Sequence, residues 1–448
     1  MQGELRSKAR NAGSYVALSH IFTQAIRFGS NLILTRLLMP EMFGLMAIVT
    51  IIMTGLAMFS DIGLLQNVIH SKRGGEPEYL QTAWTIQIVR GVLIFVIVLV
   101  ISFAFYYFGQ LGYLSPETSY GDKELPLILA VISVIAVIDG FNSIHLMLLN
   151  RNLDLAKVVT LDVVSHVAGI TFMIIWAAIY HNVWALVIGA IVSSVVKMLI
   201  SHTRWIGPKC RLYWDKTAVI EIIHFGKWIF VSSILGFLLN QGDRLLLGGL
   251  ISSETLGHYF IAFLLASASK DILLKLISSV FYPLLSKAVR ENELDLKSVY
   301  YKLRIKIDAI AMFAAGFLFV TGSLIIDLLY DSRYSEAGWM LELLSLSLIW
   351  VGWFLASQCF LATGKPKIEM ILIAIQVICF YLIVPLVFYL FGIFGTILAI
   401  SVFPFIRAIV SMVLMKKYLF LDIWREVIMI PMIFIGAFTG TLLKVVME

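Results

Sequence analysis

The sequence predicts an all-α polytopic membrane protein made of two similar six-helix bundles and one additional C-terminal helix. Hydrophobic residues make up 60% of the 448 residues and charged residues 14%, and the mean hydropathy is +0.93. Lipid can cover so much apolar surface, whereas a water-soluble fold cannot. The apolar residues gather into thirteen stretches, each of roughly 20 residues, which as a helix crosses about 30 Å of hydrocarbon.

These thirteen stretches are the predicted membrane spans. In chain order they cover residues 14–37, 42–66, 81–108, 124–149, 158–180, 183–201, 226–249, 256–284, 300–326, 338–362, 368–391, 393–415 and 426–446. The first carries Arg27 and lacks a small-residue cleavage site, so we expect a retained span and not a signal peptide. The longest connection on the predicted outer side, about residues 109–123, is too short for a folded domain. Function is therefore expected within the membrane or at its faces.

Basic residues lie in every second gap between the predicted spans. These gaps hold Arg6, Lys8 and Arg10; Lys72 and Arg73; Arg151 and Lys157; Arg204, Lys209, Arg211 and Lys216; Lys287, Arg290 and Lys297; Lys365 and Lys367; Lys416 and Lys417. The other gaps hold little beyond Lys123 and Arg333. Since positive residues are retained in the cytoplasm, the pattern predicts a cytoplasmic N-terminus. The net charge of +6 then reflects topology, and no nucleic-acid partner is expected.

The sequence contains no motif that predicts an enzyme, a metal or a cofactor. Gly226-Lys227 and Gly364-Lys365 lack the remaining residues of a phosphate-binding loop. The short aqueous loops cannot hold a catalytic domain, and no serine-hydrolase or metalloprotease signature occurs. The three cysteines, Cys210, Cys359 and Cys379, are scattered and predict neither a disulfide framework nor a metal site.

An internal repeat appears at an offset of 213 residues, where Glu41 aligns with Glu254 and Gly44 with Gly257. Each copy of this motif falls in a short turn on the predicted outer side. Two sextets of spans that start on the same side are parallel repeats about an axis along the membrane normal. We therefore predict an N-terminal bundle over 1–201, an interfacial linker over 202–225, a C-terminal bundle over 226–415 and an additional helix within 416–448. Trp205 and Trp214 suit a linker at the headgroup level.

Polar residues recur on one face of several predicted spans. The first span carries His20, Gln24, Arg27 and Asn31; the seventh Ser233, Asn240, Asp243 and Arg244; the eighth Ser267, Asp271, Lys275 and Ser278, with Lys270 beside them. Arg90, Asp139 and Arg407 each lie about half-way through a span. Ionisable groups at membrane depth normally face protein or a water-filled cavity. The polar faces therefore predict a hydrophilic cavity between the two bundles.

Basic residues outnumber acidic ones among these mid-depth groups, so the cavity is predicted to be cationic and to bind an anion. The candidate ligands are Arg27, Arg90, Lys270, Lys275 and Arg407. Arginine suits phosphate because its donors form a fork. The alternative for each residue is a buried structural ion pair. Asp61, Asp139 and Asp271 are candidate ion-coupling or structural acids, and for Asp61 a helix-end group bonded to its neighbours is the favoured interpretation.

Several motifs together resemble one transporter family. They are His224–Trp228, Asn240–Gly248, Ser252–Tyr259, Leu34–Gly44, Asp61–Gln66, Phe281–Pro283 and Ala362–Pro366. Over about residues 10–415 the chain is similar to the polysaccharide-transporter branch of the multidrug/oligosaccharidyl-lipid/polysaccharide (MOP) exporter superfamily, the Wzx-like oligosaccharide flippases. The resemblance implies two six-helix bundles in a V shape, as in multidrug (MATE) transporters. Some members have fourteen spans, whereas thirteen are predicted here.

The resemblance also implies an activity and its partners. The cargo would be an undecaprenyl-pyrophosphate-linked oligosaccharide, moved by alternating access across the bacterial inner membrane for surface polysaccharide synthesis, such as O-antigen or exopolysaccharide. Membrane lipids and the polymerase and chain-length proteins of such a system are the implied partners. The predicted cationic cavity fits an anionic lipid-linked cargo.

Two other functions remain open from the sequence. The first is a cation-coupled multidrug exporter on the same fold, whose cavity should favour acidic residues; the basic majority at mid-depth argues against it. The second is a non-catalytic membrane component of a polysaccharide assembly complex. An embedded glycan polymerase is expected to have a large outer loop, which the sequence lacks.

Overall fold

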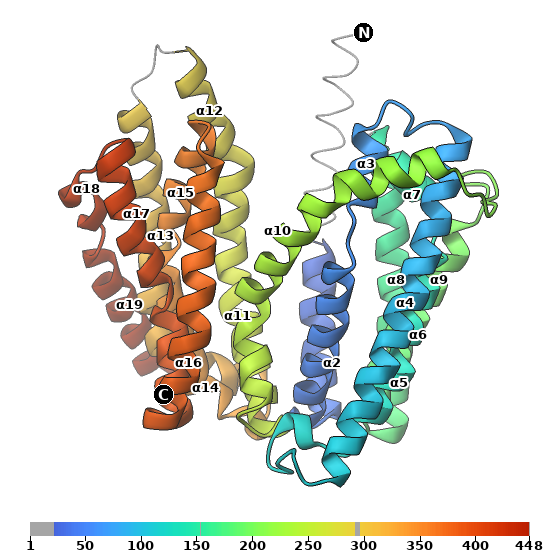
Figure 1. Cartoon of the computed structure of the whole chain (residues 1–448). Coiled ribbons are helices and arrows are strands. Elements are labelled where there is room, and N and C mark those ends of the chain that lie inside the picture. Colours follow the sequence, from blue (N-terminus) through green and yellow to red (C-terminus); the bar gives the residue numbers. More distant parts are fainter. Residues whose placement is uncertain (1–21, 153, 292–295, 448) are drawn as a thin grey trace. The chain divides into compact units, whose positions relative to one another are not determined.

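The structure is a computed structural model of the chain, and it describes residues 22–152, 154–291 and 296–447. Over these residues the protein is helical and contains no strand (Figure 1). The chain divides into two compact units, Met1–Phe237 and Leu238–Glu448. The boundary between the units lies inside one long helix, α10 (Lys216–Gly248).

The first unit, unit 1, contains nine helices before α10 in its described part. They are a helix over residues 22–37, α2 (Pro40–Phe59), α3 (Leu64–His70), α4 (Pro77–Gln110), α5 (Leu125–Ile132), α6 (Val134–Gly140), α7 (His145–Arg151), α8 (Leu155–Tyr180) and α9 (Trp184–Ser201), with a 3-10 turn at Ser119–Gly121. The span predicted over 124–149 is thus broken: α5 and α6 together are bent by 60° relative to α7.

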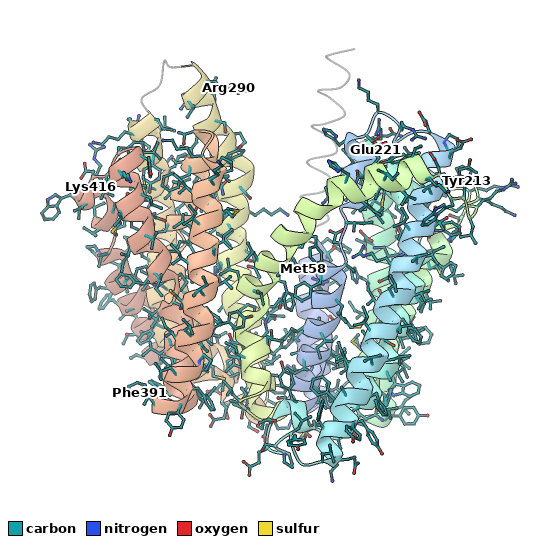
Figure 2. The ribbon with its side chains drawn as sticks, in the orientation of Figure 1. Met58, Tyr213, Glu221, Arg290, Phe391 and Lys416 are labelled. Carbon is teal, nitrogen blue, oxygen red and sulfur yellow. The ribbon has the colours of Figure 1, made fainter. Side chains whose placement is uncertain are left out.

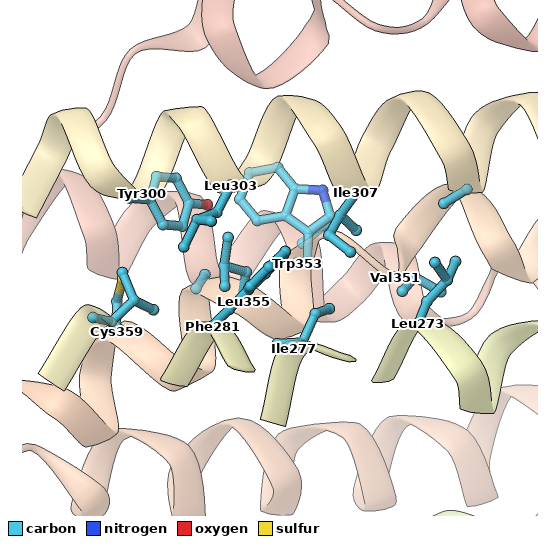
Figure 3. Packing of buried hydrophobic residues seen from close by; sticks show 14 of the residues in the cluster. Leu273, Ile277, Phe281, Tyr300, Leu303, Ile307, Val351, Trp353, Leu355 and Cys359 are labelled. Carbon is cyan, nitrogen blue, oxygen red and sulfur yellow. The ribbon is translucent and has the colours of Figure 1, made fainter. Parts of the chain in front are cut away.

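The second unit, unit 2, contains the remaining helices. They are α11 (Ser253–Leu276), a π-helical turn (Ile277–Phe281), α12 (Tyr282–Glu291), α13 (Leu296–Leu329), α14 (Ala337–Ser345), α15 (Trp353–Ala362), α16 (Pro366–Val402), α17 (Pro404–Tyr418), α18 (Ile423–Val427) and α19 (Pro431–Met447), with 3-10 turns at Ser332–Tyr334 and Leu346–Trp350. Its core lies between α13 and α15, where Trp353 packs beside Leu303 and Ile307 (Figure 3).

Helix α16 is longer than a single span because it contains a sharp reversal. Gly392 has φ 65° and ψ −158°, which is not helical. On either side of it the chain runs back on itself, since Phe403 packs against Phe380 with ring centroids 4.9 Å apart. This reversal lies between the spans predicted over 368–391 and 393–415, and glycine permits it because its φ is positive. Figure 2 shows Phe391 at this end of unit 2, with Lys416 and Arg290 at the other end.

Eight helices in the described part are long and apolar enough to cross a membrane, or nine if the bent pair in unit 1 forms one span. The thirteen predicted spans exceed this number for three reasons. The reversal at Gly392 joins two predicted spans into one long helix. The first span is described only from residue 22. Helices α10 and α11, which lie in the spans predicted over 226–249 and 256–284, are not among the eight.

The predicted linker over 202–225 is only partly irregular, because α10 already begins at Lys216. Asp215 accepts a hydrogen bond from the Thr217 N–H at 2.9 Å, as an N-terminal cap does. Arg73 donates to Asp215 at 2.8 Å, and this bond, with those from Thr217, lowers the pKa of the Asp215 carboxyl to about 2. Residues Ala218 and Ile222 are buried against α3 and α4, so the start of α10 is fastened to unit 1.

The C-terminal helix α19 packs closely on α13 through small residues. A Cβ on Gly436 would lie 2.1 Å from the Phe313 carbonyl oxygen, and one on Gly316 would lie 1.9 Å from that of Ile433. Only glycine allows two helix backbones to approach so closely, as in other membrane helix pairs. The close contact that the Gly436–Gly440 spacing permits is therefore present, and α19 is part of unit 2.

The direction of the chain across the membrane remains a prediction. We expect a cysteine placed at Glu76 to react with a membrane-impermeant thiol reagent only from the cytoplasm, and one at Lys123 only from outside, because basic loops stay inside. Both positions are exposed. Labelling of intact cells and of inverted vesicles measures this, and the opposite pattern would reverse the topology.

Candidate functional site

Unit 1 contains a polar cavity of about 480 Å³. It is lined by side chains from α2, α4, α6, α7, α9 and the turn after α6: Met53, Thr54, Ala57, Gln87, Arg90, Gly91, Ile94, Ile135, Ala136, Asp139, Gly140, Asn142, Ser143, Leu146, Met147 and Lys197. The polar residues come from segments far apart in sequence, and the helix packing brings them together. We take this cavity as the candidate site.

A close contact between α4 and α6 shapes one wall of the cavity. A Cβ on Gly91 would lie 2.4 Å from the Ala136 carbonyl oxygen and close to Gly140. Glycine at position 91 therefore lets α4 approach the end of α6. This approach positions Gln87, about one turn before Gly91, at the break in the bent span.

The break after α6 exposes backbone carbonyl groups, which need hydrogen-bond donors where water is scarce. Side chains of α4 supply them. Gln87 donates to the carbonyl oxygens of Gly140 and Asn142, both at 2.9 Å, and the Trp84 indole donates to that of Asn142 at 3.1 Å. Gln87 is therefore a structural residue of the site as well as a lining residue, and it was not among the residues predicted from the sequence.

Arg90 is held against the C-terminal end of α2. Its Nε donates to Ser60 Oγ at 2.9 Å, and its Nη2 donates to the Ala57 carbonyl oxygen. A cation at this end of a helix is favoured by the helix dipole. Asp61 lies within electrostatic reach of Arg90 and accepts a bond from the Gly63 N–H at 2.9 Å. That bond is the one expected of a helix-end group.

Asp139 lies at the other side of the cavity and is exposed to it. Its Oδ1 accepts bonds from Ser194 Oγ at 2.6 Å and Asn142 Nδ2 at 3.3 Å. One turn further along α9, Lys197 pairs with Asp162 at 2.8 Å. The cavity thus contains a lysine whose carboxylate partner lies on α8.

Arg27 is exposed and lies in unit 1. Its charge acts on His166, as do those of Asp162 and Lys197. Four of the predicted residues, Arg27, Arg90, Asp61 and Asp139, therefore lie in unit 1. Arg90 and Asp139 line the cavity with Lys197, and Arg27 acts on the same histidine as Lys197 and Asp162. The cavity together with these charges is called the polar region of unit 1.

The other predicted residues lie in unit 2, where Arg407 is the most enclosed. The Arg407 side chain is 11% exposed and forms a salt bridge with Glu369, whose side chain is 15% exposed. Its Nη1 also donates to Gln376 at 3.0 Å and its Nη2 to Ser357 at 2.5 Å. These bonds join the two arms of the α16–α17 reversal to α15. The geometry fits the alternative of a buried structural pair.

The polar face of α11 is more open. Asp271 and Lys275 are exposed, and Lys270 is half-buried. The charges of Asp271 and Asp243 both act on Lys270. Asp243 accepts a bond from the Tyr259 hydroxyl at 2.6 Å.

The balance of charge therefore differs from the count made on the sequence. That count set the basic residues against Asp139 and Asp271, but Asp162 and Glu369 also lie close to basic partners. Their spacing to Lys197 and Arg407, 35 and 38 residues, carries no helical signal, so the sequence could not pair them. No His, Cys, Asp or Glu cluster suited to a metal occurs in the part of the chain that the structure describes.

A family model described as polysaccharide biosynthesis protein matches residues 33–339. The chain belongs to this family. It is 21% identical over 343 residues to the lipopolysaccharide biosynthesis protein WzxC of Escherichia coli, a match that covers 76% of this chain and 67% of WzxC. It is 22% identical to the capsular polysaccharide biosynthesis protein CapF of Staphylococcus aureus, covering 88% of this chain and 96% of CapF. The match to the succinoglycan biosynthesis transport protein ExoT of Rhizobium meliloti is 21% identical and spans 66% of ExoT.

Two solved structures share the fold of this family member. The lipid II flippase MurJ in an inward closed conformation matches with a TM-score of 0.70 at 13% identity, over 96% of this chain and 98% of MurJ. An inward-facing multidrug resistance transporter of the MATE family, within the MOP superfamily, matches with a TM-score of 0.64 at 16% identity, over 87% of this chain and 94% of the transporter. The protein is therefore a multi-pass membrane protein with the MOP transporter fold, as the sequence predicted.

Proposed function

We propose that the protein is a flippase that moves a polyprenyl-pyrophosphate-linked oligosaccharide across the bacterial inner membrane by alternating access. The observation that carries the proposal is membership of the polysaccharide biosynthesis family. The name of ExoT, which calls that relative a transport protein, adds support. A surface polysaccharide precursor is the cargo class that fits these relatives.

The polar region of unit 1 suits the charged part of such a cargo. A pyrophosphate that leaves water needs fixed donors and cations in return, and arginine and amide groups provide both. Arg90 and Lys197 bring cationic groups to the cavity, and Arg27 is exposed in the same unit. A cavity of about 480 Å³ lies in the range of sites that hold small ligands.

A cation-coupled multidrug exporter is the second candidate, because the fold is shared with a MATE transporter and Asp139 faces the cavity. A cationic drug would bind acidic residues such as Asp139, whereas a pyrophosphate would bind the basic residues. The family membership favours the flippase. The two candidates differ in the sign of the charge that the cargo carries.

Reconstitution separates the two candidates. The purified protein is placed in liposomes that contain a polyprenyl-pyrophosphate oligosaccharide, and the sugar exposed at the outer surface is measured with a membrane-impermeant glycosidase. We expect exposure to proceed faster than in protein-free liposomes. Exchange of a fluorescent organic cation against a proton or sodium gradient, without movement of the lipid-linked sugar, would favour the exporter and contradict the flippase.

In cells, deletion of the gene should abolish a surface glycan while its lipid-linked precursor accumulates on the inner leaflet. Loss of the glycan without that precursor would instead indicate a non-catalytic role in assembly. Expression of the intact gene in the deletion strain is the control.

A further inference from the structure

Unit 2 contains a second cluster of charged residues, separate from those considered for the cargo. Arg304 and Asp308 lie one turn apart on α13, and Glu426 reaches them from α18. These residues are 0%, 1% and 3% exposed. Arg304 Nε donates to Asp308 Oδ2 at 2.5 Å, and Arg304 Nη2 lies 3.3 Å from Glu426 Oε2.

The surroundings of this cluster are closed to solvent. The Arg304 guanidinium stacks 4.3 Å from the centroid of the Trp353 ring, which lies against α13 in Figure 3. Gly352 packs so tightly on the cluster that a Cβ there would lie 1.9 Å from Asp308 Oδ1. The Tyr300 hydroxyl donates to Glu426 Oε1 at 3.3 Å.

The charges do not cancel when all three residues are ionised, since two carboxylates face one guanidinium. The other ionisable neighbours are Tyr300 and Tyr301 on α13, Cys359 on α15, and Asp422 and Arg425 beside Glu426. Arg425 is half exposed and pairs with Asp422 at 3.3 Å. Its charge is therefore shared with a third carboxylate and does not neutralise the buried pair.

A net negative charge in a buried site is strongly unfavourable, and carboxyl groups avoid it by binding a proton. Within the described ranges, Asp308 Oδ1 and Glu426 Oε2 are buried and accept no hydrogen bond, and Arg304 Nη1 and Nη2 are buried and donate none. A proton on one of the two carboxyl groups turns an oxygen from an acceptor into a donor.

We propose that Asp308 and Glu426 together hold one exchangeable proton, so that this cluster is a proton-binding site of unit 2. With the proton bound, the cluster is one cation and one carboxylate and is neutral. Without the proton, two carboxylates face one guanidinium between α13 and α18, and the cluster carries a net negative charge. Tyr301 provides a connection to solvent, because its hydroxyl bonds Glu426 and accepts the backbone N–H of the partly exposed Asp422 at 2.7 Å.

Infrared spectroscopy of the full-length protein in liposomes tests this proposal. A protonated carboxyl group has a C=O band separate from those of carboxylates, and the band shifts in D2O. We expect the wild-type protein at neutral pH to show this band, and Asp308→Asn and Glu426→Gln each to remove the part of it that the cluster contributes. In either variant the remaining carboxyl pairs with Arg304 and needs no proton.

Asp243→Asn is the matched control, because Asp243 is also buried but is a single carboxylate that lies 3.6 Å from Arg244 and accepts a bond from Tyr259. It should leave the band unchanged. Equal band intensity in the wild type and in both cluster variants would overturn the proposal.

Thermal unfolding gives a second measurement that does not depend on the band. The wild type should lose stability as the pH rises from neutral to alkaline, because the buried proton is then lost, whereas Glu426→Gln should be less sensitive to pH. A wild type and a Glu426→Gln variant with the same dependence on pH would contradict a shared proton. If Glu426→Gln does not fold, Asp308→Asn is used in the same comparison. A neutral amide should be able to replace a protonated carboxyl group. Failure of both variants to fold, while Asp243→Asn folds, would therefore also contradict the proposal.

Discussion

Replacement of Arg407 by glutamine is expected to remove most of the folded protein from the membrane. Arg407 and Glu369 form a salt bridge with side chains that are 11% and 15% exposed. Loss of the guanidinium leaves the Glu369 carboxylate buried without its cation, and such a loss costs about 3–5 kcal/mol of unfolding free energy. Gln376 and Ser357, which also accept bonds from Arg407, lose their donor as well.

The amount of folded protein is measured by fluorescence size-exclusion chromatography and by thermal unfolding in detergent. The double variant Arg407→Gln/Glu369→Gln is the matched control, because it removes both charges and should recover a large part of the stability. If Arg407→Gln folded like the wild type and lost only export, Arg407 would bind cargo, as the sequence analysis predicted, and would not serve mainly as a structural pair.

Replacement of Arg27 by glutamine is expected to have the opposite profile: normal amounts of folded protein and export of the glycan reduced about tenfold or more. Arg27 is exposed, so its charge is not needed to balance a buried carboxylate in the way that Arg407 is. A lost hydrogen bond to a charged group costs about 1.5–3 kcal/mol, which corresponds to about a tenfold to hundredfold effect on binding.

Export is measured as surface glycan in a deletion strain that carries each variant at equal protein level. Arg27→Lys should restore part of the export, since the charge returns without the fork of donors. Lys123→Gln, in an exposed loop outside the polar region, is the control and should export normally. Wild-type export by Arg27→Gln would remove Arg27 from the proposed path of the cargo.

The two variants differ because burial, which the sequence does not give directly, decides what a basic residue does. Arg27 and Arg407 both sit within apolar stretches and were equivalent candidates in the sequence. In the structure Arg407 meets Glu369 across the reversal at Gly392, while Arg27 remains exposed. Arg90 is a third case, since it caps the end of α2 and also lines the cavity.

The sequence by itself determined the fold class and the family. A membrane span requires a long apolar helix, and basic loops stay in the cytoplasm. The length of apolar stretches and the position of basic residues can both be read directly from the sequence. The motifs around Gly44, Asp61 and Gly257 were likewise local, so they were sufficient for the resemblance that the family match over residues 33–339 supports. The position of the reversal at Gly392 also fell between two predicted spans.

The tertiary structure alone decided which charges are neighbours. Asp162 with Lys197, Glu369 with Arg407, and Glu426 with Arg304 come from different helices, and their sequence separations are set by loop and span lengths that carry no information about contact. Gln87 could not be recognised because its role depends on the break after α6. That break lies in a different span, so the residues around Gln87 in α4 give no sign of it. Electrostatic energy depends on distance and burial in space, so a count of charges along the sequence gave candidates, and the packing of helices determined their partners.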